Sequence, residues 1–176
     1  MKSVAESKKK QNIGEYIIYM YQMEDLIRSY HFNLEEIRKY VISHYPISDK
    51  EKEEVKAWFE SLIEQMKTEN IQEKGHLREV QKEVDALSQI HWDLLKEDKE
   101  YFQIYNQAKP YILDFISSAD GHHLGHEIQI CLNGIYGLLL SRLTGKKVTK
   151  DLLRAAEAFG AVLGYVTMVY QEKEKD

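Results

Sequence analysis

A carboxylate in the first long amphipathic segment occupies a position that a helix would bury. Ile13, Ile17, Met20 and Ile27 recur at helical spacing, and at about 100° per residue Glu24 falls in the middle of the stripe that they form. A carboxylate that leaves water needs a partner or a proton. The chemistry of Glu24 therefore depends on what neutralises it.

Two interpretations of Glu24 follow from its neighbours. Arg28 lies four residues further on, so an internal Glu24–Arg28 pair that fixes helix packing is the simpler interpretation. The alternative is a polar pocket that binds a ligand or performs acid–base chemistry, with Asp25 next to Glu24 and the hydroxyl of Tyr16 as further polar groups.

A histidine lies on an apolar helical face further along the chain. His91 shares this face with Leu87, and a lone histidine in such a place is more often a satisfied core residue than a ligand. His76, three residues after Glu73, lies at the edge of the same face. If Glu24, Glu73 and His91 converge in space, they would form a buried polar site or a carboxylate–histidine metal centre.

A second group of histidines contains His122 and His126, which are four residues apart. Two imidazoles at this spacing can chelate a divalent ion, but zinc normally takes a third protein ligand. The group follows Gly121 at an expected helix start, where exposed histidines are ordinary. We interpret it as a solvated helix end, with a metal site as the alternative.

Familiar catalytic and cofactor-binding motifs are missing from the sequence. It contains no glycine-rich phosphate loop, no GxSxG elbow and no CxxC pair. Cys131 is the only cysteine, so it forms no intramolecular disulfide, and no basic neighbour at helical spacing would activate it. We therefore predict no catalytic residue and no cofactor, and we favour a protein that is not an enzyme.

The elements that would position these residues are helices. Residues that favour helices dominate a chain of 176 residues with only two prolines. Capping patterns and helix breakers predict about seven helices, which begin near residues 12, 33, 48, 71, 98, 122 and 149. Pro110 would kink the fifth helix or mark a restart, and Gly145 would end the sixth.

Short connections between these helices favour antiparallel packing of neighbours. We predict an all-α, antiparallel helical bundle in a single domain over residues 1–176, with a frayed tail at residues 1–11 and a charged tail at residues 172–176.

The last two predicted helices carry small residues at helical spacing. Gly134, Gly137 and Ser141 lie opposite the bulky residues of one helix, and Gly160 and Gly164 lie four apart on the other. Glycine costs about 1 kcal/mol in a helix interior relative to alanine, so a series of glycines indicates a close approach of two backbones. Either these helices pack tightly on each other, or the same faces form a subunit interface.

Charge and hydropathy exclude several classes of partner. The net charge of −5 argues against nucleic-acid binding, which needs a basic surface. The most apolar stretch, residues 128–143, contains Gln129, Asn133 and Arg142 and is too short to span a membrane. No apolar run near the N-terminus follows basic residues in the manner of a signal peptide. We expect a cytoplasmic protein that binds neither membrane nor nucleic acid.

Several segments resemble one known family. The run from Asn12 to Arg28, NIGEYIIYMYQMEDLIR, resembles the N-terminal signature of an uncharacterised family of short helical proteins, mostly from Bacteroidetes, that is classed as a domain of unknown function. Residues 58–77, 108–112 and 133–149 are similar to further segments of that family, whereas Tyr21 stands where we expect tryptophan. The resemblance implies a compact helical bacterial protein and supplies no activity, cofactor or catalytic residue.

Two functions are compatible with these features. The leading hypothesis is a non-enzymatic bundle that acts through contact with another protein, most simply a second copy in a homodimer. The alternative is a small-molecule or metal-binding protein with a buried polar site at Glu24, Arg28, Glu73 and His91.

Overall fold

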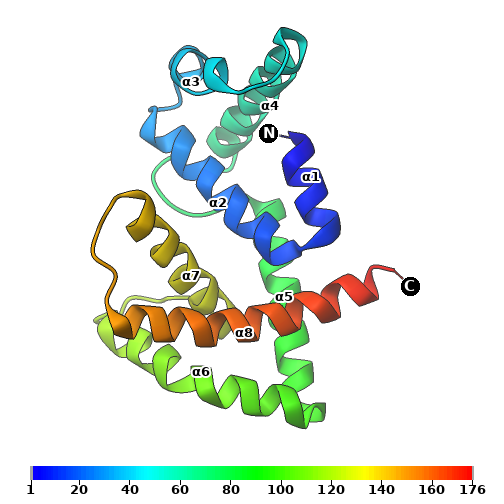
Figure 1. The fold of residues 1–176 in the computed structure, drawn as a ribbon, viewed down its shortest axis with the longest axis vertical. Helices are drawn as coiled ribbons and strands as arrows, with labels where there is room; N and C mark the ends of the chain where they lie inside the picture. Colours follow the sequence, from blue (N-terminus) through cyan, green and yellow to red (C-terminus); the bar gives the residue numbers. More distant parts are fainter. Residues whose placement is uncertain (1, 176) are drawn as a thin grey trace. The chain divides into compact units, whose positions relative to one another are not determined.

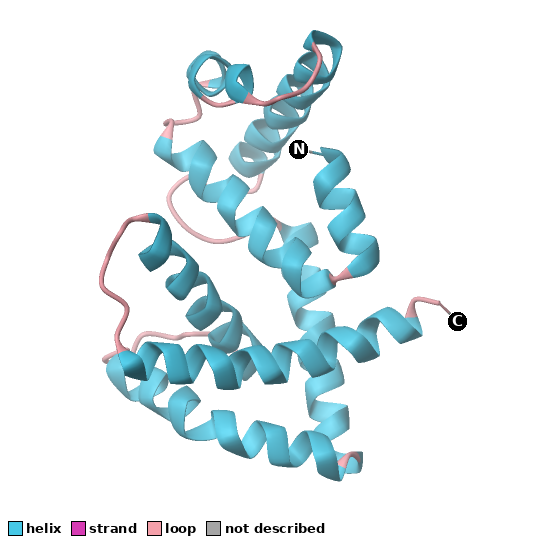
Figure 2. Cartoon of the chain, viewed as in Figure 1, coloured by secondary structure: helices cyan, strands magenta, loops and turns pink. Residues whose placement is uncertain are grey.

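The computed structural model describes residues 2–175, which contain eight α-helices, one 3-10 helix and no strand (Figures 1 and 2). The prediction of an all-α fold is therefore confirmed. The elements are α1 (Lys2–Gln11), α2 (Ile13–Ser29), α3 (Leu34–Tyr40), the 3-10 helix η1 (Ile42–His44), α4 (Asp49–Thr68), α5 (Arg78–Glu97), α6 (Lys99–Ser118), α7 (Glu127–Leu143) and α8 (Lys150–Lys173).

The chain, for which we predicted one domain, divides into two compact units. The N-terminal unit comprises Met1–Gln11 and Glu15–Lys82, and the C-terminal unit comprises Asn12–Gly14 and Glu83–Asp176. Helix α5 contributes its first residues to one unit and the remainder to the other.

Side-chain caps begin several helices at the predicted places. Ser48 forms a capping box at α4: its hydroxyl accepts from the backbone N–H of Glu51, whose carboxylate accepts from the backbone N–H of Ser48. Asn33, Asp98 and Thr149 are the N-caps of α3, α6 and α8. These short polar side chains satisfy backbone donors that would otherwise lack partners.

Other boundaries differ from those that the sequence predicted. Residues expected as a frayed tail form α1, in which Ala5 is buried. Helix α5 begins at Arg78 instead of residue 71, and the residues before it form a connection in which Asn70 and Gly75 have positive φ. Helix α6 runs through Pro110 without a restart, and α7 begins at Glu127 after a turn-rich segment.

The core of the C-terminal unit forms where α6, α7 and α8 pack against one another (Figure 1). Helix α8 buries Phe159, Val162 and Val166 on one face, as its apolar spacing predicts. By length and composition α8 could also cross a membrane, a criterion that the core helix of a soluble protein meets as well.

Candidate functional site

The N-terminal unit buries the carboxylate of Glu24, which is 1% exposed. Its Oε1 accepts the backbone N–H of Leu77 at 3.0 Å, and its Oε2 lies 2.7 Å from Nδ1 of His76. Because an ionised carboxylate only accepts hydrogen bonds, Nδ1 of His76 donates. The His76 ring also stacks on Tyr21 with 3.8 Å between ring centroids.

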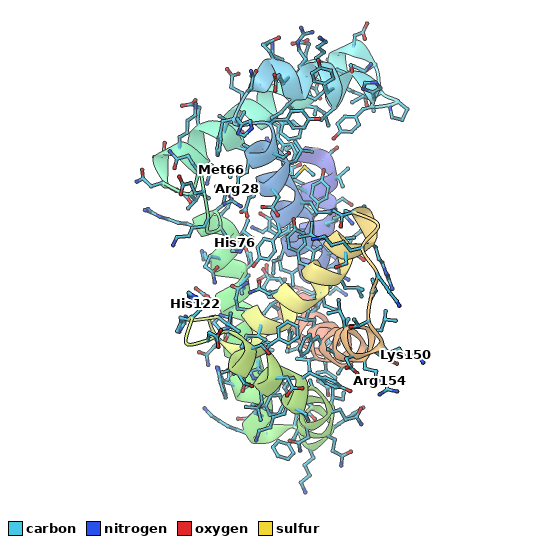
Figure 3. All side chains as sticks on the ribbon, turned by 90° about the vertical axis from the view of Figure 1, so that its left-hand side faces the viewer. Arg28, Met66, His76, His122, Lys150 and Arg154 are labelled. Atoms are coloured by element: carbon cyan, nitrogen blue, oxygen red, sulfur yellow. The ribbon has the colours of Figure 1, made fainter. Side chains whose placement is uncertain are left out.

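Arg28 binds the same connection between α4 and α5 one helical turn further along α2. Its guanidinium donates to the carbonyl oxygens of Ile71 at 2.9 Å and Gly75 at 2.6 Å, and to Asp25 at 3.1 Å. Nε of Arg28 is buried without a partner among the described residues. Figure 3 labels Arg28 and His76 in this part of the unit. Two side chains of α2 therefore hold a segment that has no helix of its own.

The structure thus gives Glu24 and Arg28 separate partners in place of the predicted Glu24–Arg28 pair. Glu73 lies exposed in the connection, and Tyr16 is buried with the ammonium group of Lys9 5.2 Å from its ring centroid. We call Glu24, His76, Leu77 and Arg28 the α2 clamp. The sequence placed His76 only at the edge of an apolar face, and no residue pattern identified it as the partner of Glu24.

The C-terminal unit buries His91, which is also 1% exposed, among side chains from three helices. Nε2 of His91, on α5, lies 2.7 Å from Oε2 of Glu127, on α7. Nδ1 lies 2.6 Å from the hydroxyl of Tyr101, on α6, and Tyr105 donates to Oε1 of Glu127 at 2.8 Å. If Nε2 donates to the carboxylate, Nδ1 accepts from Tyr101. We call these four residues the His91 cluster.

Electrostatics fix the protonation states of Glu127 and the two tyrosines of the His91 cluster. Burial alone would raise the pKa of Glu127, but hydrogen bonds from His91 and Tyr105 bring that pKa below its usual value. Burial raises the pKa of both Tyr101 and Tyr105 far above the normal range, and it raises the pKa of Cys131 to about 12. Glu127 is therefore ionised near neutral pH, while the tyrosines and the Cys131 thiol keep their protons. A thiol with this pKa is not a nucleophile.

The polar atoms at the centre of both groups have partners within the chain. Glu24 and Glu73 belong to the N-terminal unit and His91 to the C-terminal unit. Each carboxylate oxygen of Glu24 and each ring nitrogen of His91 already has a protein partner. Within residues 2–175 no group of three or more histidine, cysteine, aspartate or glutamate residues is arranged to hold a metal ion. Both groups are built to tie elements together.

His126 serves as a helix cap. Its Nδ1 accepts the backbone N–H of Gln129 at the start of α7, and its Nε2 lies 3.2 Å from Oδ1 of Asp85. His122 is exposed in the connection before α7. Since both ring nitrogens of His126 are engaged, chelation of a metal by His122 and His126 would require His126 to give up its cap or its hydrogen bond to Asp85.

The small residues of α7 and α8 separate into one packed position and several open ones. A Cβ at Gly134 would lie 2.6 Å from the ring of Phe159, so α7 and α8 approach closely there. A Cβ at Gly160 would meet only Ile135, at 3.9 Å, and a Cβ at Gly137 or Gly164 would meet nothing within 4 Å. Ser141, the other small residue predicted at an interface, is half-buried.

Fold and polar groups together define an all-helical protein in which the buried side chains of Glu24 and His91 are paired within the chain. Residues 2–176 match a family described as a domain of unknown function, DUF4924, and the chain belongs to that family. No curated protein and no solved structure matches the chain.

Proposed function

We propose that this protein is a non-enzymatic helical protein that acts through protein–protein contact, and that it self-associates through its C-terminal unit. The observation that carries the proposal is the second half of α7. Residues 135–143 are apolar on nearly every side of the helix, as in a helix that is fully surrounded, yet they are half-buried or exposed. Leu140 is 38% exposed and Leu143 is 66% exposed.

The first half of the same helix shows what a covered α7 looks like. Ile128, Ile130, Cys131 and Leu132 are all buried, with exposures of 1% or less. The composition of α7 changes little between its two halves, whereas its burial changes sharply. A partner is therefore expected over the second half.

Helix α8 supplies a neighbouring exposed face. Leu153, Gly160, Ala161, Gly164 and Met168 are exposed on it with Glu157 among them, and three of these six residues have little or no side chain. Gly160 lies beside Ile135 of α7, so this face adjoins the apolar half of α7. We call residues 135–143 together with the exposed face of α8 the α7–α8 surface.

We expect the α7–α8 surface to bind a second copy of the chain. It combines exposed leucines on α7 with open space at Gly160 and Gly164 on α8, so one copy provides both side chains to insert and room to receive them. A two-fold axis places such a surface against itself with both sets of contacts formed twice. The closed α2 clamp and His91 cluster favour this function over ligand binding at Glu24, Arg28, Glu73 or His91. A lone buried cysteine is in keeping with the cytoplasmic location that we propose.

The test is the molar mass of the full chain by light scattering after size exclusion, over a wide range of concentrations. We expect a dimer, and we expect Gly164→Leu to shift it to monomer by occupying the space that the partner needs. The substitution should not destabilise the isolated subunit, because nothing lies within 4 Å of the added Cβ. Leucine also favours a helix over glycine by about 1 kcal/mol.

Phe102→Gln is the matched control, since Phe102 is 48% exposed but lies on α6, outside the α7–α8 surface. It should leave the dimer intact, while Leu143→Gln should weaken it. A monomeric wild-type chain at the highest concentration, or a dimer indifferent to Gly164→Leu, would show the proposal to be wrong.

A further inference from the structure

A cavity of about 460 Å³ opens in the C-terminal unit, away from the residues of the His91 cluster. The end of α6, the connection before α7 and the start of α8 surround it. Phe115, Leu124, Leu152 and Ala155 give it an apolar lining, and these four side chains are half-buried or buried. Its size and lining are those of sites that hold small organic molecules.

Two carboxylates stand at the mouth of this cavity. Asp114 and Asp151 both line it and both are exposed, unlike the apolar residues. Among the described residues neither side chain takes part in a hydrogen bond or ion pair; Ser117 contacts only the backbone carbonyl of Asp114. The cavity thus combines an apolar interior with unpaired negative charge at its rim.

The position of Asp114 is electrostatically unfavourable in the chain alone. Asp151 lies in the first turn of α8, where the helix dipole stabilises a carboxylate. Asp114 lies near the C-terminal end of α6, where the unpaired carbonyl groups already make the potential negative. The last turn of α6 contains no basic residue to offset it.

The nearest basic residues of α8 form no ion pair with this rim. Arg154 follows Asp151 at a spacing of three residues, at which helical side chains are neighbours, but no ion pair joins Asp151 to Arg154 or to Lys150 among the described residues. Figure 3 labels Lys150 and Arg154 at the right-hand side of α8. Both carboxylates are therefore open to a cationic ligand.

We propose that this cavity binds a small organic cation, a protonated amine carried on an apolar body. The apolar body lies among Phe115, Leu124 and Leu152, and the ammonium group lies at the mouth beside Asp114, with Asp151 as the second carboxylate. Neutral and anionic molecules of the same shape bind more weakly, because they leave Asp114 unpaired or repel it. This site is independent of self-association, since none of its lining residues belongs to the α7–α8 surface.

The test is an NMR titration of the full chain with three probes of matched shape: 4-phenylbutylamine, 4-phenylbutanol and 4-phenylbutanoate. We expect the amine to bind most tightly, and to shift the methyl signals of Leu124 and Leu152. Asp114→Asn should weaken binding of the amine about two- to fivefold, the range for a partly exposed ion pair, and should leave binding of the alcohol unchanged.

Glu157→Gln is the matched control, because it removes the same charge from an exposed position of α8 outside the cavity. It should leave the amine affinity unchanged. Ala119→Phe should fill the cavity from its rim and weaken all three probes together, while far-ultraviolet circular dichroism confirms that the helices remain. Equal binding of amine and alcohol, unchanged amine binding in Asp114→Asn, or shifts confined to signals outside the cavity would overturn the proposal.

Discussion

Each unit of the chain contains a histidine–glutamate pair, and the two pairs are mirror images in burial: the buried partner is the glutamate in one pair and the histidine in the other. In the α2 clamp the glutamate is buried, with its side chain 1% exposed, and His76 is 27% exposed. In the His91 cluster the histidine is buried, with its side chain 1% exposed, and Glu127 is 23% exposed. Both pairs have the same 2.7 Å separation between nitrogen and oxygen.

The difference reflects what each pair has to satisfy. The connection before α5 has backbone groups without helical partners, so a buried acceptor, Glu24, takes the N–H of Leu77 while Arg28 takes two carbonyls. In the C-terminal unit the backbone groups near His91 are already helical, and the polar groups to be joined are side chains. An imidazole suits that task because it has one nitrogen for Glu127 and another for Tyr101.

The largest expected effect comes from removing the histidines one at a time. We expect His91→Ala to lower the free energy of unfolding by about 3 kcal/mol, because it opens a cavity and leaves the buried Tyr101 hydroxyl without its partner. His76→Ala should cost only about 1 kcal/mol, since water can reach the space that it leaves. Urea denaturation of both variants measures the contrast, and equal losses would contradict the mirror-image description.

Removing the glutamates should reverse the order of the two units. We expect Glu24→Ala to cost about 2 kcal/mol, because the buried N–H of Leu77 loses its acceptor. Glu127→Ala should cost about 1 kcal/mol, because water can replace a partly exposed carboxylate. Glu24→Gln is the control for the first variant: it keeps an oxygen for Leu77 and should recover part of the loss in the same urea experiment. No recovery would mean that the charge of Glu24, not its acceptor, is what the α2 clamp needs.

Local sequence patterns predicted most of the fold. The caps at Ser48, Asp98 and Thr149 act within one helical turn, so the residues that make them are visible in the sequence. The prediction of a frayed tail is wrong for residues 2–11, because a segment rich in lysine has the composition of a solvated tail and nothing in the sequence marks Ala5 as buried.

The partners of the polar residues could not be predicted in the same way. The position of Glu24 on an apolar stripe indicates that its carboxylate needs a partner. The nearest basic residue in the sequence, Arg28, is not that partner. His76 lies 52 residues away from Glu24, and Glu127 lies 36 residues away from His91. Such pairs depend on how the helices pack, and helical spacing along one segment carries no information about that packing.

The pH dependence of stability sharpens the comparison further, with a smaller effect. The folded chain holds the pKa of Glu127 below its usual value of 4.5, so its ionised form stabilises the fold. That contribution is complete above the unfolded pKa and is lost as the pH falls through the lower pKa of the folded state. We expect Glu127→Gln to be less stable than the wild type by about 1 kcal/mol at pH 7, and the gap to close as the pH falls below about 4.5. Urea denaturation of both proteins at several pH values measures this gap, in which the titration of all other carboxylates cancels. A gap that stays constant down to the lowest pH would show that the charge of Glu127 does not stabilise the His91 cluster.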